Sequence, residues 1–186
     1  MQKYTSANTS INATKLPTTF TKFSFVPGTR NFDLGGGRFD NATEYLNRLG
    51  VENVIYDPFN RSRKHNENAI KKSYRAFDTC TINNVLNVVD NLDEINNIVK
   101  RANFVLKTNG VAFFKIYEGD KTGIGRPTKD DCYQQNKKAG WYKFFVENFF
   151  EEVYKVGDIV IGKRPKLITL PVMFPTDISG NFLLFK

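Results

Sequence analysis

Apolar and polar residues follow one another along this chain in short blocks whose period changes. Thr29–Leu34 and Val51–Tyr56 are apolar runs of strand length, and the block between them has apolar residues at 42, 45, 46 and 49. That spacing is typical of one face of an amphipathic helix, with Asp40 as its N-cap and Gly50 as its stop. The pattern therefore predicts a strand–helix–strand unit with glycines 35–37 in its first turn.

The same alternation continues to residue 162. The pattern predicts a polar helix over 65–74, a strand over 77–83, a helix over 92–106 with an exit turn at 107–110, a strand over 111–117, a helix over 130–149 and two strands around a turn within 152–162. Strands that alternate with helices and end in an antiparallel hairpin indicate an α/β fold with a mostly parallel sheet.

The length of 186 residues predicts a single domain with flanking segments. Residues 1–22 are rich in Thr, Ser and Asn without periodicity, so we expect a flexible N-terminal arm. Residues 23–163 form the predicted domain. Residues 164–186 carry several large apolar residues that are costly to expose, so we expect this C-terminal extension to pack on the domain or on a partner, with a homo-oligomer as one consequence.

Composition and charge narrow the class of protein. The formal net charge of +8 favours a polyanionic partner such as nucleic acid, or an anionic cofactor, and solubility alone explains it equally well. Two distant cysteines and one histidine argue against a zinc-finger framework, a disulfide scaffold and any metal site. The sequence shows no apolar signal core and no run of membrane-spanning length, so we expect a cytoplasmic protein with no membrane partner.

The glycines Gly35, Gly36 and Gly37 follow the first predicted strand. In a parallel sheet, ligands bind in the crevice beyond the carboxyl ends of the strands. A glycine-rich turn at that place lets the backbone approach a nucleotide-like ligand without side chains in the way. Asp57 follows the second strand, where a carboxylate is placed to accept hydrogen bonds from both ribose hydroxyls of a bound adenosine.

The segment Asp33-Leu-Gly35-Gly-Gly37 has the form D-x-G-x-G, and with it the sequence resembles class I S-adenosylmethionine-dependent methyltransferases over residues 28–163. A dinucleotide fingerprint would need a glycine at Asp40. The resemblance implies a Rossmann-like fold and S-adenosylmethionine as cofactor. It places Asp33 at the methionine end of the cofactor, the glycines 35–37 beneath it and Asp57 on the ribose; Pro58, Phe59 and Asn83 complete the expected cofactor site.

Two further segments extend the resemblance. Asp78–Val88, which contains NVLNV, stands where the fourth strand of the family delivers residues to the substrate, and it is similar to a segment of small methyltransferase-like proteins of phages and bacteria. The closing hairpin ends near Gly162, as in the family. The chain between Asp57 and Asp78 is too short for a strand between two helices, so we expect the third-strand region to be reduced and its adenine contact to be lost.

The acceptor of the methyl group is not settled by these motifs. Phe39 replaces the third glycine of the longer family form, and Asp57-Pro58-Phe59 looks like a shortened amine-methylating N/D-P-P-Y/F motif that stands after the wrong strand. An asparagine, Asn83 or Asn84, occupies the place of the acid that 2′-O-methylating members use, which argues against that class. We retain Asn84 as a catalytic candidate.

The segment 117–127 is the other source of candidates, because it follows a strand at the ligand end of the sheet. Glu118 and Asp120 are candidate bases, and Arg126 is a candidate to hold a substrate phosphate or carboxylate. The alternative is a solvated connection without function. Tyr133, next to Gln134 on the helix predicted there, is placed to stack on a planar substrate, as are Trp141 and Tyr142, unless these rings belong to the core.

Three functions follow from these patterns. We favour an S-adenosylmethionine-dependent methyltransferase that acts on nucleic acid or on a small molecule. The first alternative is a non-catalytic module that keeps the fold and binds S-adenosylmethionine or nucleic acid, the latter through the basic residues at 61–64 and 71–72. The second is a nicotinamide oxidoreductase, which the missing third glycine and the closing hairpin argue against.

Overall fold

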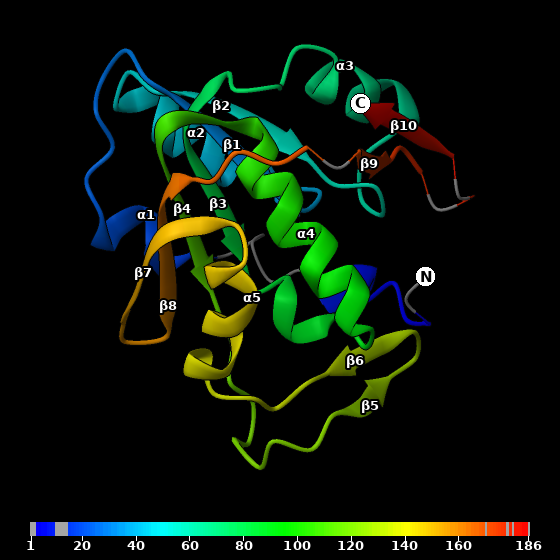
Figure 1. Ribbon diagram of the computed structural model, residues 1–186. Helices are drawn as coiled ribbons and strands as arrows, with labels where there is room; N and C mark the ends of the chain where they lie inside the picture. The colour runs from blue at the N-terminus through cyan, green and yellow to red at the C-terminus, as the bar shows by residue number, and fades with distance from the viewer. Residues whose placement is uncertain (1–2, 10–14, 170, 178, 180, 186) are drawn as a thin grey trace.

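The computed structural model describes residues 3–9, 15–169, 171–177, 179 and 181–185. Its centre is a six-stranded sheet in the order β2-β1-β3-β4-β8-β7 (Figure 1). The strands are β1 (Arg30–Leu34), β2 (Glu52–Tyr56), β3 (Phe77–Asn83), β4 (Leu106–Lys115), β7 (Phe150–Val156) and β8 (Ile159–Pro165). The first four are parallel, and β8 and β7 form the antiparallel end. The predicted α/β fold with a closing hairpin is confirmed.

The parallel strands are connected by α2 (Asn41–Arg48), α3 (Arg63–Ile70) and α4 (Leu92–Val105), while α1 (Thr18–Lys22) precedes β1 and α5 (Lys143–Glu147) precedes β7. Short 3₁₀ turns are η1 (Ala7–Thr9), η2 (Leu86–Val88) and η3 (Ala139–Tyr142). The side chains of Ser62 and Asn91 accept hydrogen bonds from the first turns of α3 and α4, as N-caps do. Asp40 is at the N-cap position of α2, but its carboxylate pairs with Arg61 instead of a helix amide.

The third-strand region is reduced, as expected, because β2 is the edge of the central sheet within the described residues. The C-terminal segment packs beside this edge as β9 (Val172–Pro175), which pairs with β10 (Phe182–Phe185). The ring of Phe174 lies 5.4 Å from that of Tyr56 on β2 and 5.7 Å from that of Phe104 on α4. An element from the end of the chain therefore packs between the ring at the end of β2 and α4.

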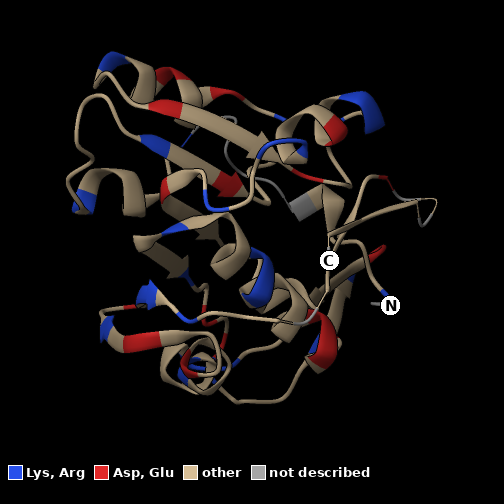
Figure 2. Ribbon diagram, turned by 45° about the horizontal axis from the view of Figure 1, so that its top comes forward, with Lys and Arg blue, Asp and Glu red and all other residues tan. Residues whose placement is uncertain are grey.

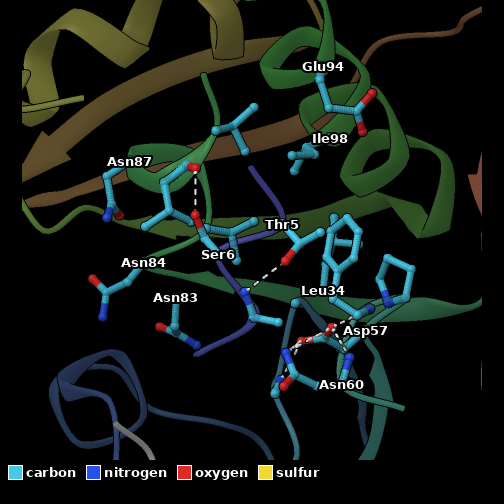
Figure 3. Close-up of a pocket in the computed structure, with 18 of the residues that line it drawn as sticks. Thr5, Ser6, Leu34, Asp57, Asn60, Asn83, Asn84, Asn87, Glu94 and Ile98 are labelled. Carbon is cyan, nitrogen blue, oxygen red and sulfur yellow. Dashed lines mark hydrogen bonds between the residues drawn. The ribbon is translucent and has the colours of Figure 1, made fainter. Parts of the chain in front are cut away.

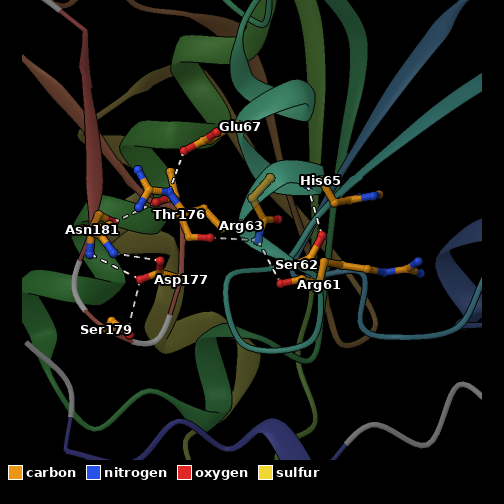
Figure 4. A network of polar contacts seen from close by, with 10 residues as sticks. Arg61, Ser62, Arg63, His65, Glu67, Thr176, Asp177, Ser179 and Asn181 are labelled. Atoms are coloured by element: carbon orange, nitrogen blue, oxygen red, sulfur yellow. Dashed lines mark hydrogen bonds and ion pairs between the residues drawn. The ribbon is translucent and has the colours of Figure 1, made fainter.

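Polar contacts fix the same segment to the loop before α3 and to α3 itself (Figure 4). Asn66 Nδ2 donates to the carbonyl of the buried Thr176 at 3.2 Å and to the carbonyl of Asp57 at 3.0 Å. Hydrogen bonds from Asn181 lower the pKa of Asp177 in the turn that follows β9. One asparagine of α3 thus joins the end of β2 to the C-terminal segment.

The predicted helix over 130–149 is wrong in its first half. Residues 126–134 form a two-stranded hairpin of β5 (Arg126–Lys129) and β6 (Cys132–Gln134), and helical structure begins only at Ala139. Asp131 and Asn136 have φ values of +53° and +55°, which a helix does not allow. The exit turn expected at 107–110 is also wrong, because β4 begins at Leu106 directly after α4.

The expected flexible arm differs from the structure where the structure describes it. Thr18–Lys22 form α1, and the side chain of Phe20 is buried in a cluster with Phe25 and Leu46. Part of the arm, 1–2 and 10–14, lies outside the described residues. The domain boundaries at 23 and 163 stay a prediction.

None of the helices in the described residues is long and apolar enough to cross a membrane. The described part of the chain also holds no group of three or more His, Cys, Asp or Glu side chains able to bind a metal ion. Cys80 and Cys132 are both free thiols in the buried interior, so Cys80 packs as a small apolar residue.

The contribution of the C-terminal segment to stability is testable. Phe174→Ala removes the ring that packs on Tyr56 and Phe104, and we expect it to lower the free energy of unfolding by about 3–5 kcal/mol. The neighbouring Met173, 46% exposed on the same strand, is the matched control, and Met173→Ala should cost less than about 1 kcal/mol. Urea denaturation measures both. Equal effects of the two substitutions would contradict the packing described for β9.

Candidate functional site

A pocket of about 560 Å³ lies at the carboxyl ends of β1, β2 and β3 (Figure 3). Each strand contributes the residues that follow it: Gly35 and Gly37 after β1, 57–60 after β2, and 83–85 at and beyond the end of β3. It is also lined by the N-terminal residues 5–7, side chains of α4, the chain at 87–89, Tyr133 and Pro175. This is the position at which parallel α/β sheets bind ligands.

The glycine turn is required by the packing of the chain itself. Gly35 has a φ of +79°, and a Cβ atom there would lie 2.4 Å from Cγ2 of Val85. A Cβ atom on Gly36 would lie 2.7 Å from Oδ2 of Asp33. Gly37 has a φ of +75°, which side chains rarely adopt. Gly35 and Gly37 also line the pocket, whereas Gly36 does not.

The loop after β2 holds the glycine turn through both its amide and its carbonyl. Oδ2 of Asp57 accepts from the Gly37 amide at 2.9 Å, and Oδ1 accepts from the amides of Phe59 and Asn60 at 3.0 Å. Arg61 Nε donates to the Gly37 carbonyl at 2.7 Å. The carboxylate expected to bind ribose is therefore already bound by backbone amides of its own chain.

Asp33 lies behind the turn and does not line the pocket. Its side chain is buried, and Thr81 Oγ1 donates to Oδ1 at 2.9 Å. Burial raises the pKa of Asp33 from 3.8 to about 7; the Thr81 hydrogen bond opposes this rise, and the charge of Asp57 adds to it. Its contact with the methionine end of a cofactor stays a prediction.

Two asparagines at the end of β3 carry unsatisfied atoms. Asn83 Oδ1 accepts from Thr19 Oγ1 at 2.7 Å, and its side-chain amide faces the buried Asp33, where it opposes the rise in pKa that burial causes, without completing a hydrogen bond of good geometry. Oδ1 of Asn84, whose φ is +57°, is buried and has no hydrogen-bond partner among the described residues. Both residues line the pocket. Buried polar atoms without partners are costly, so they mark a place for a ligand or water.

The candidates of the segment 117–127 do not meet at the pocket. Glu118 accepts from the Ala139 amide at 2.8 Å, and Asp120 pairs with Arg126 at 2.8 Å. Hydrogen bonds from Thr122 lower the pKa of Asp120. None of Glu118, Asp120 and Arg126 lines the pocket. Their roles as bases and as an anion-binding residue stay predictions, and the contacts show them stabilising the loop.

Tyr133 does line the pocket, although it lies on β6 and not on a helix. Its ring stacks on Tyr4 at 5.6 Å between centroids. Pro58 and Phe59 line the pocket as well. Tyr142, by contrast, is fully buried in the main hydrophobic cluster, so the core alternative holds for it.

Sequence reasoning missed the N-terminal part of the wall. Thr5 donates from its amide to Asp131 at 2.9 Å, and Ser6 Oγ donates to the Val88 carbonyl at 3.2 Å. In each bond the two residues are more than 80 positions apart in the sequence, so no local pattern predicts the contact. The contacts hold residues 5–7 over the pocket between the β5–β6 hairpin and the chain after β3.

Sequence reasoning also missed Glu94 and Arg101, which form an ion pair of 2.6 Å on α4 at the pocket. A signal was present: the two charges stand two helical turns apart beside the apolar positions 95, 98 and 102. The basic residues at 61–64 were expected to contact nucleic acid in the non-catalytic alternative. Of these, Arg61 binds the Gly37 carbonyl and pairs with Asp40 within the protein.

The protonation of Asp33 gives a pH-dependent stability. Because its pKa is higher in the folded protein than in the unfolded chain, its contribution is favourable below about pH 4 and is lost as the pH rises to 7. The Asp33→Asn variant has no carboxyl group at this position, so its stability lacks this pH dependence. We expect the stability of the variant relative to the wild type to increase by roughly 2–4 kcal/mol between pH 4 and pH 8, measured by urea denaturation. A difference that does not change with pH would exclude a buried, protonated Asp33.

No family model matches the chain, and no curated protein matches it by sequence. Solved structures do match. An S-adenosylmethionine-dependent methyltransferase of Methanosarcina mazei has a TM-score of 0.59 at 12% identity, covering 81% of this chain and 99% of that one. The 1,6-didemethyltoxoflavin-N1-methyltransferase of Burkholderia thailandensis, with bound 1,6-didemethyltoxoflavin and S-adenosylhomocysteine, has a TM-score of 0.57 at 15% identity, covering 76% and 72%. This chain has the fold of the class I methyltransferases.

Proposed function

We propose that this protein is an S-adenosylmethionine-dependent methyltransferase whose cofactor binds in the pocket at the ends of β1, β2 and β3. The observation that carries the proposal is the convergence of the glycine turn, Asp57 and Asn83–Asn84 on one cavity from three adjacent parallel strands. Its volume of about 560 Å³ is in the range of small-molecule and cofactor sites. The solved structures with this fold support the same cofactor, since one of them holds S-adenosylhomocysteine.

The residues of the pocket fit this group. The side chains of Asn83 and Asn84 line the pocket and offer amide groups that can hydrogen-bond a polar ligand. The bonds from Asn60 Nδ2 to Asp57 are long, 3.2 and 3.3 Å, and are the ones that ribose hydroxyls would replace. The shorter bonds from backbone amides would remain and keep the carboxylate in place. When bound, S-adenosylmethionine supplies a methyl group activated by its sulfonium.

The pocket favours an acceptor that needs no strong base. Methyl transfer is a displacement whose rate depends largely on alignment. Among the described residues that line the pocket, the carboxylates are Asp57 and Glu94, and both already accept hydrogen bonds from other groups. An uncharged nitrogen with its own lone pair fits this site better than a hydroxyl. Nucleic acid and small molecules both contain such nitrogens.

A non-catalytic module remains the second candidate, supported by the position of Glu118 and Asp120 outside the pocket. Such a module would bind nucleic acid through its positive charge of +8. Figure 2 shows Lys and Arg distributed over many elements. This distribution supports the catalytic proposal more than the nucleic-acid module.

Cofactor binding is the first test. Isothermal titration should give dissociation constants of roughly 1–100 μM for S-adenosylmethionine and S-adenosylhomocysteine. Asp57→Ala should weaken both at least about tenfold, because charged hydrogen bonds to ribose are lost. Asn60→Ala removes the competing amide, together with an exposed hydrogen bond from Arg38, and should bind at least as tightly as the wild type.

Thermal melting of each variant separates lost binding from lost folding, since Asp57 also holds the glycine turn. The control is Asp158→Asn, which changes a carboxylate paired with Lys115 away from the pocket and should bind like the wild type. Folded Asp57→Ala with unchanged affinity would exclude the ribose assignment.

Catalysis is the second test. With S-adenosylmethionine labelled in its methyl group, we expect label to appear in a nucleic-acid or small-metabolite fraction. Binding of the cofactor without transfer to any fraction, together with salt-sensitive binding of RNA or DNA, would favour the non-catalytic module.

A further inference from the structure

One wall of the pocket is closed by an ion pair on α4. Glu94 Oε1 and Arg101 Nη1 are 2.6 Å apart, and both residues line the pocket. Only 5% of the Arg101 side chain and 21% of the Glu94 side chain are exposed. Figure 3 shows Glu94 and Ile98 on the opposite side of the pocket from Asn83 and Asn84. Charges taken this far from water are costly unless further groups bind them.

The pair has unused hydrogen-bonding capacity. Arg101 Nε donates to the Met173 carbonyl of β9 at 2.6 Å, and Nη1 donates to Glu94. A guanidinium has more N–H groups than these two bonds use. Glu94 Oε2 accepts only a long bond of 3.3 Å from Asn97, so the carboxylate also keeps free lone pairs. Donors and acceptors therefore stand side by side at the cavity.

The chemistry of the surroundings restricts the ligand. The two charges of the pair cancel, and an anionic group bound there would leave a net negative charge in a buried place. Tyr56, Ile98 and Pro175 add apolar surface to the same wall. A neutral, flat ring with a donor next to an acceptor on its edge matches both properties. Heterocyclic bases have such an edge.

We propose that Glu94 and Arg101 bind the edge of the cofactor's adenine, with the amino group donating to Glu94 and Arg101 donating to a ring nitrogen. The inference rests on the proposed function, since it takes the ribose to be at Asp57. The adenine then lies towards α4 and the methionine part towards Asn83 and Asn84. The pair, fixed by β9, takes over the base contact that the missing third strand does not supply.

The test compares the affinities of two cofactor analogues that differ only in the base. S-inosylhomocysteine differs from S-adenosylhomocysteine by a carbonyl oxygen in place of the amino group and by a hydrogen on the adjacent ring nitrogen, so in the same orientation the oxygen faces the Glu94 carboxylate unfavourably. We expect the wild-type protein to bind S-adenosylhomocysteine at least about tenfold more tightly in isothermal titration. In Glu94→Gln the amide can donate to the carbonyl, so the ratio should fall by about tenfold.

Asp158→Asn is the matched control, because it also neutralises a paired carboxylate, with Lys115 as the partner, outside the pocket. Its ratio should equal that of the wild type. If the ion pair only fastened β9, Glu94→Gln would change the melting temperature and leave the ratio unchanged, which would overturn the inference.

Equal binding of both compounds by the wild type would overturn it too, even if Glu94→Gln did not fold, while leaving the proposed function intact. Failure of the wild type to bind S-adenosylhomocysteine would remove the proposed function and this inference together.

Discussion

The hydrogen bond from the Gly37 amide to the Asp57 carboxylate is the interaction on which the site depends. The parallel register places Leu34 beside Tyr56, so β1 and β2 end at the same level, and Gly35 N donates to the Tyr56 carbonyl at 2.7 Å. The carboxylate then joins the two turns that follow. Because a buried carboxylate without donors would be costly, the backbone amides around Asp57 fix it in one orientation. These bonds hold the two turns that line this side of the pocket together.

The loss of the third strand changes what the rest of the chain must do. The C-terminal segment fills the space beside β2, and its backbone accepts hydrogen bonds from Tyr56 Oη and from Arg101. Burial raises the pKa of Tyr56, so its hydroxyl remains a donor at all ordinary pH values. Core and pocket thus share residues. A change in the packing of β9 reaches the wall of the site through Arg101 and through Pro175, which itself lines the pocket.

Local patterns predicted the parts of this structure that local physics decides. The β1–α2–β2 unit, β3 and α4 follow from apolar periodicity, capping residues and glycine, and they lie within a few residues of their expected bounds. The β5–β6 hairpin could not be found this way. All residues of β5 are exposed, so its sequence lacks the alternation of apolar and polar residues that would predict a strand. The positions of Thr5 and Pro175 in the pocket depend on contacts more than a hundred residues apart.

A glycine motif is weaker evidence for a ligand than buried polar atoms that have no hydrogen-bond partner. A ligand that approaches the backbone explains three glycines, but so do the Val85 side chain, the Asp33 carboxylate and two positive φ angles. These constraints hold whether or not anything binds. The amide oxygen of Asn84 and the unused donors of Arg101 are different, because the described fold gains nothing from leaving them unpaired. These polar atoms are therefore stronger evidence for a bound ligand than the glycine turn.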